Sequence, residues 1–340
     1  MSKHSVLFIT QRGERHQQAA LQAAPPEFEI TMRRGPSKEE IIRLLPGKEF
    51  LISERTGEID ADIIAAGKNL RLIQRLGSRT YDIDLQAAQK ANIPVCYMPV
   101  RSCVWVAEHC ILQMLSLARR IREMIRIANE AADWGLPPKK CDEDYFAPNW
   151  SGRQDIRNLF QSTVGIVGFG EVGSEVAKHL KSFDCTVLYY DIQRYPPKAE
   201  QAVGAAYAPL DDLLAQSDFV CITMPLFPQT AGMVNADFLN KMKPGACLVT
   251  SGAGGVVNEA DVAQALQSGR LHGFAADTHD YEPIRPDSPL LPIARQQDVN
   301  VILTPHIAGA GLSHTSSERA RDYANLLNIL QNRPLQFRLV

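Results

Sequence analysis

Three glycines in a fixed pattern, Gly168, Gly170 and Gly173, lie between an apolar run at 163–167 and a segment with helical periodicity. A second β-type run follows and ends at Asp191. Glycines at these spacings permit a tight turn, let the backbone approach a pyrophosphate and let the helix pack on the strand, while the helix N-terminus attracts phosphate. The order of strand, glycine loop, helix, strand and acid therefore predicts a βαβ unit that binds a dinucleotide.

The acid at the end of the second strand bears on which dinucleotide is bound. The Asp191 carboxylate is expected to accept hydrogen bonds from the adenosine ribose hydroxyls and to repel a 2′-phosphate, which favours NAD over NADP. Arg194 nearby argues in the opposite direction. The alternative, that the glycines only make a turn and Asp191 is a solvated strand end, fits the complete motif less well. The cofactor contacts predicted here are Gly168, Gly170, Glu171, Val172, Gly173 and Asp191.

Short β-type runs alternate with amphipathic segments along the whole chain. They lie at 6–10, 28–32, 50–53, 72–76 and 94–97 in the first part, and at 164–167, 186–190, 219–223, 247–250, 273–277 and 301–304 in the second. This rhythm predicts βα units around parallel sheets. A length of 340 residues suits about two domains. The predicted fold class is α/β, with two Rossmann-like domains and doubly wound parallel sheets.

Three other segments differ from this rhythm. Residues 106–121 place apolar side chains at three- and four-residue spacing, which predicts a long helix. Residues from about 130 to 160 mix tryptophan, proline and charge, and we expect an irregular arm that contacts another subunit. The tail from 316 to 330 places its apolar residues on one helical face and is expected to pack as a helix.

Composition limits the kinds of partner. A net charge of −2 gives no general attraction to nucleic acid or to an anionic membrane, so a small-molecule partner is favoured. No signal-peptide pattern or bilayer-length apolar run is present, and we expect a cytoplasmic protein without a membrane segment. Seven cysteines without a CxxC pair suit reduced thiols better than disulfides or zinc, and no metal site is predicted.

Two later segments carry groups suited to proton transfer: residues 273–283 contain Asp277 and Glu282, and residues 304–309 contain His306. An imidazole, with an unperturbed pKa near 6.5, can give and take a proton at neutral pH. Together with the glycine motif, the Val-Ala-Glu-His run at 106–109 and the segment at 225–230, these segments resemble in order and spacing the D-isomer-specific 2-hydroxyacid dehydrogenase family. The resemblance covers nearly the whole chain.

The resemblance implies a domain plan. Residues 1–103 and 308–340 would form a flavodoxin-like substrate-binding domain, and residues 104–307 an inserted NAD-binding Rossmann domain that carries the arm at about 130–160. Hinges would lie near Arg101 and His306. Members of the family are usually homodimers joined through their NAD domains, so a homodimer is expected.

The resemblance also implies residue roles. His306 would be the acid/base residue, protonating a carbonyl oxygen as NADH delivers hydride, and Glu282 would hold its ring and favour the charged form. Without the matching glutamate, a structural histidine would be the better interpretation of His306. His109 is expected to be a packing or interdomain residue. The remaining cofactor contacts are expected to be Pro225, Thr230, Ser251, Gly252, Asp277, His306 and Gly309.

The sequence departs from the family pattern at two places. Ala253 stands where the family has the arginine that pairs with the substrate carboxylate; charge-assisted hydrogen bonds of that kind are worth about 1.5–3 kcal/mol each. In the substrate domain, Gly77-Ser78-Arg79 replaces a Gly-x-Gly loop, which makes Ser78, Arg79 and Ala253 the candidate substrate-binding positions. Arg79 either restores the missing charge or is a solvated loop residue.

Three functions remain open. The first is an NAD-dependent oxidoreductase that acts on a 2-hydroxy or 2-oxo acid or a related carbonyl compound, with non-standard substrate recognition. The second is an NAD(H)-binding regulatory or sensor protein with weak or no turnover, which the loss of the arginine supports and the retention of His306 with Glu282 opposes. The third is an enzyme of the same fold that uses its proton relay for other chemistry.

Overall fold

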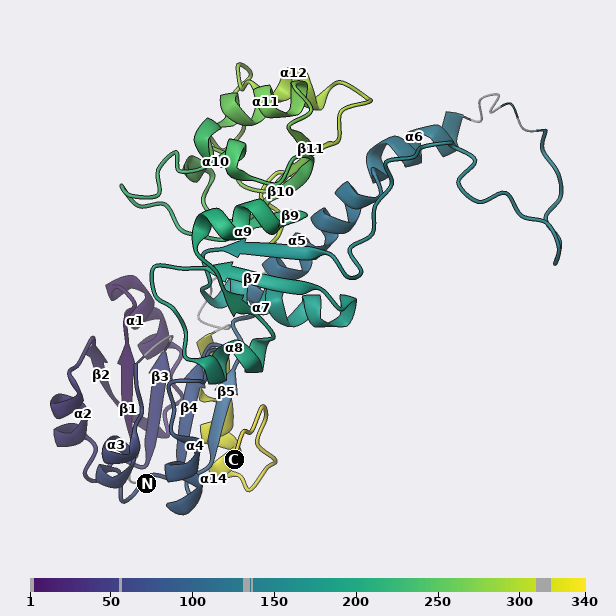
Figure 1. Ribbon diagram of the computed structural model, residues 1–340. Coiled ribbons are helices and arrows are strands. Elements are labelled where there is room, and N and C mark those ends of the chain that lie inside the picture. Colours follow the sequence, from purple (N-terminus) through teal and green to yellow (C-terminus); the bar gives the residue numbers. More distant parts are fainter. Residues whose placement is uncertain (1–2, 55–56, 131–134, 136, 310–318) are drawn as a thin grey trace. The chain divides into compact units, whose positions relative to one another are not determined.

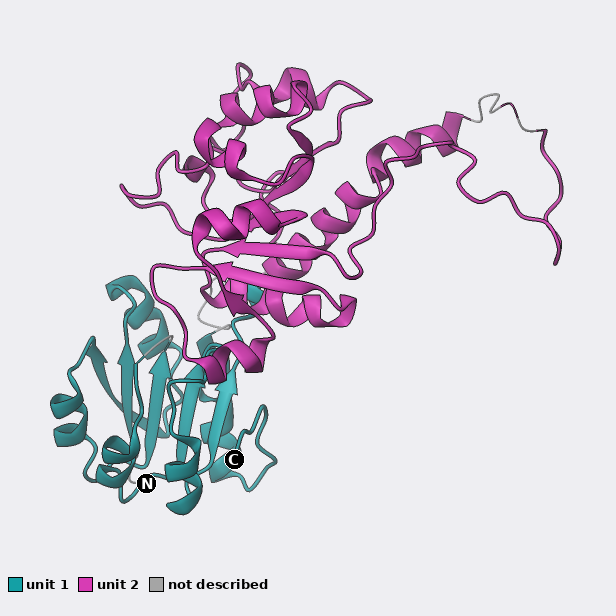
Figure 2. Cartoon of the chain, viewed as in Figure 1, with its two compact units in different colours: residues 1–104, 309–340 teal, residues 105–308 magenta. Residues whose placement is uncertain are grey.

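The computed structural model describes residues 3–54, 57–130, 135, 137–309 and 319–340. The chain divides into two compact units (Figure 2): unit 1 comprises residues 1–104 and 309–340, and unit 2 comprises residues 105–308. Both boundaries lie one residue from the positions expected from the sequence. The first boundary falls inside a helix that begins in unit 1 and continues into unit 2.

Unit 1 contains a five-stranded parallel sheet in the order β2-β1-β3-β4-β5. Parallel neighbours require crossover connections, and a short helix follows each of the first four strands (Figure 1). The elements are β1 (His4–Thr10), α1 (Glu14–Gln22), β2 (Phe28–Arg34), α2 (Lys38–Leu44), β3 (Phe50–Glu54), α3 (Ala61–Ala66), β4 (Leu72–Leu76), α4 (Leu85–Lys90), β5 (Val95–Met98), the 3₁₀ turn η3 (Ala320–Tyr323) and α14 (Ala324–Leu330). This is the doubly wound, flavodoxin-like order.

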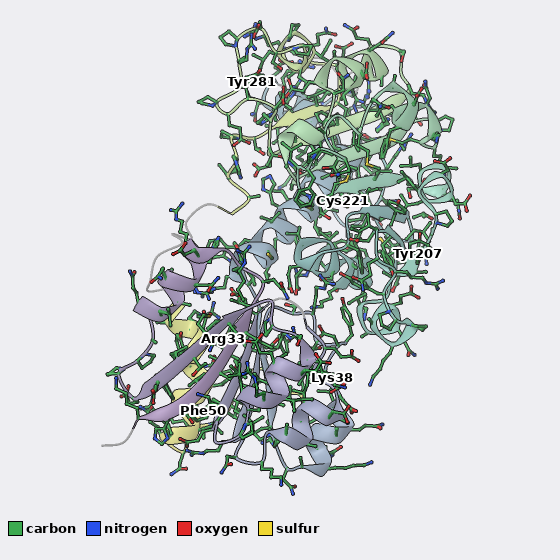
Figure 3. The ribbon with its side chains drawn as sticks, turned by 90° about the vertical axis from the view of Figure 1, so that its left-hand side faces the viewer. Arg33, Lys38, Phe50, Tyr207, Cys221 and Tyr281 are labelled. Atoms are coloured by element: carbon green, nitrogen blue, oxygen red, sulfur yellow. The ribbon has the colours of Figure 1, made fainter. Side chains whose placement is uncertain are left out.

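The central strands of unit 1 are buried on both faces, because helices cover the sheet on each side. Every residue of β3 and of β4 is buried, as expected for parallel strands covered on both faces, and the buried set includes the polar Ser53, Glu54, Gln74 and Arg75. Phe50 lies in this core, whereas Lys38 stands at the surface on α2 (Figure 3). The side chains of Asp60 and Asp84 cap α3 and α4 by accepting hydrogen bonds from Ile63 N and Ala87 N.

A buried amide network fastens α14 to the sheet. Asn325 Nδ2 donates to Gln74 Oε1 on β4 at 2.9 Å and to Gln336 O at 2.9 Å, and Asn325 Oδ1 accepts from Gln336 N at 2.8 Å. Asn325 and Gln74 are both fully buried. Buried polar groups are costly when they lose their partners, so this network fixes where the C-terminal segment packs.

We predict that Asn325→Ala lowers the free energy of unfolding of unit 1 by about 2–4 kcal/mol, because it leaves the buried amide oxygen of Gln74 without its hydrogen-bond donor. Urea-dependent hydrogen exchange of β4 amides measures the change. Asn328→Ala is the matched control, because Asn328 makes one exposed bond, to Pro334 O at 3.1 Å, and is expected to cost less than about 1 kcal/mol. Equal effects of the two variants would contradict the prediction.

Unit 2 contains a seven-stranded parallel sheet in the order β12-β11-β10-β9-β6-β7-β8. From β6 the chain builds outward first through β7 and β8 and then, on the other side, from β9 to β12, so the order reverses between β6 and β9. The carboxyl ends of strands at such a switch point form the usual ligand crevice of doubly wound sheets. The predicted fold class, with two such sheets, is confirmed.

The strands of unit 2 are joined by helices throughout (Figure 1). The elements are α5 (Arg101–Ala118), α6 (Ile121–Glu130), β6 (Thr163–Val167), α7 (Glu171–Leu180), η1 (Lys181–Phe183), β7 (Thr186–Tyr190), α8 (Pro197–Val203), β8 (Ala206–Tyr207), α9 (Leu210–Gln216), β9 (Phe219–Ile222), α10 (Ala236–Lys241), β10 (Ala246–Thr250), η2 (Gly254–Val256), α11 (Glu259–Gln267), β11 (Leu271–Ala276), α12 (Leu290–Ala294) and β12 (Val301–Leu303).

The long helix predicted over 106–121 ends earlier than expected. Arg120 adopts a left-handed conformation with φ of 47°, which ends α5 and lets α6 begin at Ile121. Its buried guanidinium donates hydrogen bonds to the carboxylates of Glu123 and Asp155 and to Asp298 O. Asp155 and Asp298 are far from Arg120 in sequence, so helical periodicity does not reveal these contacts. α6 extends away from the sheet (Figure 1), and the described residues between 135 and 162 contain no helix or strand. The other residues of the expected arm, 131–134 and 136, and residues 316–318 of the expected tail helix lie outside the described residues.

No helix that the structure describes is both long enough and apolar enough to cross a bilayer.

A partly buried histidine, His272 on β11, lies among basic groups of unit 2. Burial first, and then the charge of Arg157, lower the pKa of His272 from 6.5 to about 4; Arg120 and Arg153 add to the effect and Asp155 opposes it. Because the unfolded chain takes up this proton at higher pH than the folded chain, the free energy of unfolding falls as the pH decreases from about 6.5 to 4.

We predict that His272→Gln removes this part of the acid sensitivity, on the order of 2–3 kcal/mol between those pH values. All three tryptophans lie in residues 105–308, so urea unfolding followed by tryptophan fluorescence reports on unit 2. The wild-type protein should lose more stability than the variant between pH 7 and pH 4 (assay values). Parallel pH profiles for the two proteins would count against the assignment.

Candidate functional site

The glycine loop follows β6 at the switch point of the unit 2 sheet. Gly168 has φ of 89°, and a Cβ there would lie 2.7 Å from Met224 N, so only glycine fits. A Cβ on Gly173, in the first turn of α7, would lie 2.5 Å from Gly168 O. These two glycines let the loop pack against the segment after β9 and let α7 lie close to β6.

Gly170, the residue that caps α7, has a different surrounding. A Cβ placed on it would meet nothing within 4 Å, so the space beside it is open. Gly170 has no side chain that could cap the helix. Open space beside the amides at a helix N-terminus suits a phosphate group, and this loop therefore fits the pyrophosphate of a dinucleotide.

Asp191, directly after β7, holds the glycine loop from the side. Its Oδ2 accepts a hydrogen bond from Phe169 N at 2.6 Å, and its Oδ1 accepts from Gln193 N at 3.3 Å. The Phe169 ring stacks on Tyr189 at 4.1 Å, and the Tyr195 hydroxyl donates to Phe169 O. Asp191 thus has a structural role that the sequence did not indicate, beside the role proposed toward a ribose.

Arg194, the residue that argued for NADP in the sequence, makes contacts with other side chains of the protein. Its Nε lies 3.2 Å from Glu200 Oε1, and its guanidinium lies over the Tyr207 ring at 5.4 Å. An arginine held by a carboxylate is less suited to receive a 2′-phosphate.

Two further loops close the same edge of the sheet. After β9, Thr230 Oγ1 donates to Pro225 O at 2.7 Å and accepts from Phe227 N at 2.8 Å, which closes a tight turn. After β10, the amides of Ser251 and Gly252 donate to Ile222 O, and the amide of Ala253 donates to Met224 O. These bonds join the two loops to each other beside the glycine loop.

The loop after β10 also touches the segment after β11. A Cβ on Gly254 would lie 1.8 Å from His279 O, so this position accepts only glycine. Ala253 is partly buried and packs against the apolar core of unit 2. The methyl group at this position offers no charge and no hydrogen-bond donor.

His306 and Glu282 meet, as the sequence predicts. His306 Nδ1 lies 2.6 Å from Glu282 Oε2, and Glu282 Oε1 accepts from His279 N at 3.1 Å. Desolvation acts to raise the pKa of Glu282, but the hydrogen bonds from His306 and His279 N outweigh it and hold the pKa below its usual value. The carboxylate is therefore charged at neutral pH, and the imidazole remains 58% exposed. Tyr281, also exposed, projects from the same loop (Figure 3).

Asp277 lies buried beneath this pair. Its Oδ1 accepts from Thr304 Oγ1 at 2.6 Å and from Ile307 N at 2.9 Å, and its Oδ2 accepts from Ala308 N at 2.8 Å. The loop that carries His306, itself at φ of 54°, is thus held on both sides of the histidine. The geometry gives Asp277 a positioning role, and its contact with a cofactor stays a prediction.

His109 belongs to the same network, although the sequence suggested a packing or interdomain residue. Its Nε2 lies 3.2 Å from Thr304 Oγ1 and 3.5 Å from Asp277 Oδ1. Burial lowers its pKa, and the charge of Asp277 opposes the shift. His109 and Thr304 are the residues that sequence reasoning missed; the only signal was that both lie in segments that carry the family resemblance.

The remaining predicted positions belong to unit 1. Gly77, after β4, has φ of 114°, and its amide donates to Met98 O at 2.8 Å. Ser78 follows it, and the Arg79 guanidinium lies over the Tyr81 ring at 5.4 Å and donates to the Tyr81 hydroxyl. Gly309 opens the C-terminal part of unit 1. Among the described residues, no cluster of histidine, cysteine and acidic side chains is arranged to hold a metal ion.

Known proteins share this arrangement. The family model for the D-isomer specific 2-hydroxyacid dehydrogenase, NAD binding domain, matches residues 111–308. A D-3-phosphoglycerate dehydrogenase from Archaeoglobus fulgidus is 34% identical over 284 residues, which are 83% of this chain and 50% of that protein. A glyoxylate reductase from Thermofilum pendens is 33% identical over 298 residues, which are 87% of this chain and 82% of that protein. The chain spans about half the length of the phosphoglycerate dehydrogenases it matches.

Solved structures agree with the fold. A protein from Pyrococcus horikoshii OT3 has a TM-score of 0.57 and 25% identity, covering 99% of this chain and 95% of its own. A Granulicella formate dehydrogenase has a TM-score of 0.56 and 27% identity, covering 92% of this chain and 80% of its own. The family match falls on the unit that holds the glycine loop, His306 and Glu282, and NAD is the cofactor that this domain binds. The chain therefore belongs to the D-isomer specific 2-hydroxyacid dehydrogenase family, and unit 2 is its NAD-binding domain.

Proposed function

We propose that the protein is an NAD-dependent oxidoreductase that transfers hydride between NAD(H) and a 2-hydroxy or 2-oxo acid or a related carbonyl compound. The observation that carries this proposal is the hydrogen bond of 2.6 Å between His306 and Glu282, at the same sheet edge as the glycine loop. A histidine paired with a charged carboxylate can exchange a proton with a substrate oxygen. Family membership supports the same reaction type.

The proton transfer follows from the pair's geometry. Nδ1 of His306 bonds the Glu282 carboxylate, which leaves Nε2 as the nitrogen that exchanges a proton with the substrate. NADH, when bound, supplies the hydride to the carbonyl carbon. His306 gives the proton from Nε2 to the carbonyl oxygen, so hydride and proton together complete the alcohol. Glu282 orients the imidazole by its hydrogen bond to Nδ1, and Asp277 keeps the His306 loop in place.

We propose NAD rather than NADP, with the adenosine ribose at Asp191 and the pyrophosphate at Gly170 and the first turn of α7. The remaining proposed contacts come from the loops after β9 and β10, at Pro225, Thr230, Ser251 and Gly252. The engagement of Arg194 with Glu200 supports this choice, because the partly exposed Asp191 carboxylate is then the charge nearest to the expected ribose position.

His306→Asn is predicted to lower kcat by about 10²- to 10⁴-fold, since it removes the proton donor, and to leave the NADH dissociation constant unchanged. Glu282→Gln keeps a hydrogen-bond acceptor without the charge and should cost less. The assay is NADH oxidation with a panel of 2-oxo acids, aldehydes and ketones, with NADH binding measured by fluorescence.

The control for these variants is His4→Asn, because His4 forms another histidine–glutamate pair, with Glu49 at 2.9 Å, in unit 1. It should keep full activity. Equal turnover by the wild-type protein and His306→Asn would refute the proposed proton donor.

Substrate recognition is proposed to be non-standard, because Ala253 occupies the family's arginine position. If the loop only lacks the side chain, Ala253→Arg should raise kcat/KM for a 2-oxo acid about 10- to 100-fold, which corresponds to a charge-assisted hydrogen bond of about 1.5–3 kcal/mol. Ala253→Met, long but uncharged, is the matched control and should give no gain. A gain from both variants, or from neither, would argue against a missing carboxylate contact.

The loss of the arginine also favours a second function, an NAD(H)-binding regulatory or sensor protein with weak or no turnover. The observation that supports this alternative is the alanine at position 253. If the wild-type protein binds NADH but reduces no carbonyl compound in the panel, the regulatory or sensor function would be favoured over the oxidoreductase.

We further propose a homodimer formed through unit 2, on the apolar side chains that α5 and α6 leave exposed: Leu112 at 57%, Ile121 at 39% and Ile125 at 55%. All seven cysteines are free thiols, which supports the proposal of a reducing, cytoplasmic location.

A further inference from the structure

A second histidine, His279, lies in the loop after β11 between Asp277 and Glu282, and the proton transfer described above gives its side chain no role. Tyr281, two residues later, marks this loop in Figure 3. His279 is 6% exposed, so its ring is removed from water. A buried imidazole of this kind either fills space or acts through its hydrogen bonds, and its contacts distinguish the two roles.

The ring of His279 reaches the loop after β12. Its Nε2 lies 2.9 Å from Thr304 O. A carbonyl oxygen only accepts, so Nε2 carries a hydrogen and donates it. The same oxygen accepts from His306 N at 3.0 Å. The carbonyl of Thr304 therefore has two donors, as many as it has lone pairs, and they are the ring of His279 and the main chain of His306.

This carbonyl helps to set the backbone of His306. The bond from His306 N to Thr304 O closes a three-residue turn, and His306 then has a left-handed φ of 54°. Such a backbone persists only where the surroundings hold it. Asp277 holds the two amides that follow His306. The ring of His279 holds the carbonyl that precedes it, so the histidine is fixed from both directions along the chain.

The main chain of His279 holds the other member of the pair. His279 N donates to Glu282 Oε1 at 3.1 Å, and the second oxygen, Oε2, lies 2.6 Å from His306 Nδ1. One carboxylate oxygen is thus fixed by His279 while the other meets the imidazole. His279 therefore acts on both partners, on Glu282 through its amide and on His306 through the carbonyl of Thr304.

The main chain of His279 is itself held in place. A Cβ on Gly254, in the loop after β10, would lie 1.8 Å from His279 O and 2.7 Å from His279 N. The backbone of His279 therefore packs directly on Gly254, which follows Ala253. Three loops of unit 2, those after β10, β11 and β12, meet at this one residue.

We propose that His279 is a positioning residue for the proton transfer: the donor at its Nε2 sets the His306 imidazole against the Glu282 carboxylate. The inference rests on the proposed oxidoreductase function, since it concerns the proton donor of that reaction. What the site requires is a hydrogen-bond donor at the position of Nε2. A packing residue would require only a side chain that fills the same space.

Two substitutions of similar length separate these requirements. The amide nitrogen of His279→Gln can donate near the position of Nε2, whereas His279→Met has no donor. We expect His279→Met to lower kcat by about 10- to 100-fold with an unchanged NADH dissociation constant, and His279→Gln to retain most of the wild-type kcat. His272→Met replaces another partly buried histidine, on β11 itself, and should leave kcat unchanged.

A second measurement needs no turnover. In a protein with ¹⁵N-labelled histidine, NMR shows which ring nitrogen of a neutral imidazole carries the hydrogen. The proposal requires the hydrogen on Nε2 of His279 and on Nδ1 of His306 in the wild-type protein, with signals assigned by His279→Gln and His306→Asn. In His279→Met the hydrogen of His306 should move toward Nε2, because the bond to Glu282 that selects Nδ1 is loosened.

The proposal is overturned if wild-type His279 carries its hydrogen on Nδ1, if His279→Met keeps the wild-type kcat, or if His279→Gln and His279→Met lose kcat equally. Should His279→Met fail to fold, the two tautomers of the wild-type protein decide. A wild-type protein that reduces no carbonyl compound contradicts the proposed function. The tautomers of His279 and His306 still test the positioning in that case, so the two failures are distinguishable.

Discussion

The buried carboxylate of Asp277 determines where the proposed proton donor can be. Its two oxygens accept three hydrogen bonds, from one side chain and two amides of the loop after β12, and His306 lies between those contacts. His306 has a left-handed backbone, a conformation that persists only when the surroundings hold it. Glu282 then meets the ring from the loop after β11. The buried Asp277 carboxylate thus orders the pair through the loop, and His109 adds to that order from α5.

The parallel sheet of unit 2 explains why residues far apart in sequence meet at one edge. The carboxyl ends of β6, β7, β9, β10, β11 and β12 all lie there, and each is followed by a loop that carries a proposed role. Close approach between these loops is possible because glycine stands at Gly168, Gly252 and Gly254, where a Cβ would lie 2.7, 2.6 and 1.8 Å from neighbouring backbone. Gly170 is the exception, since its free side faces open space. Gly168, Gly252 and Gly254 therefore allow protein segments to pack closely, whereas Gly170 leaves space in which a ligand could bind.

Sequence reasoning succeeded where a signal is local and failed where a contact is distant. The glycine motif, the strand rhythm and the spacing of Glu282 and His306 are patterns of adjacent residues, and they predicted the fold, the family and the pair. The network of His109, Thr304 and Asp277 joins positions separated by up to 195 residues, and no periodicity reveals it. The break at Arg120 depends on partners at Asp155 and Asp298, which are distant from it in sequence. The ion pair between Glu54 and Arg319 in unit 1 joins positions 265 residues apart, so it could not be read from the sequence.

The proposed loss of an arginine at position 253 concerns a side chain and not the hydrogen bonds of the loop backbone. The amide of Ala253 still bonds Met224 O, and the next residue, Gly254, still packs under His279 O. The methyl group packs against the core of unit 2, so the loop needs no arginine to keep its course. On the proposed function, one cation toward the substrate is lost, whereas the glycine loop, Asp191 and the His306–Glu282 pair are all present. A change confined to one side chain on an intact scaffold is how a fold acquires a different substrate range, and the proposed change at Ala253 is therefore compatible with family membership.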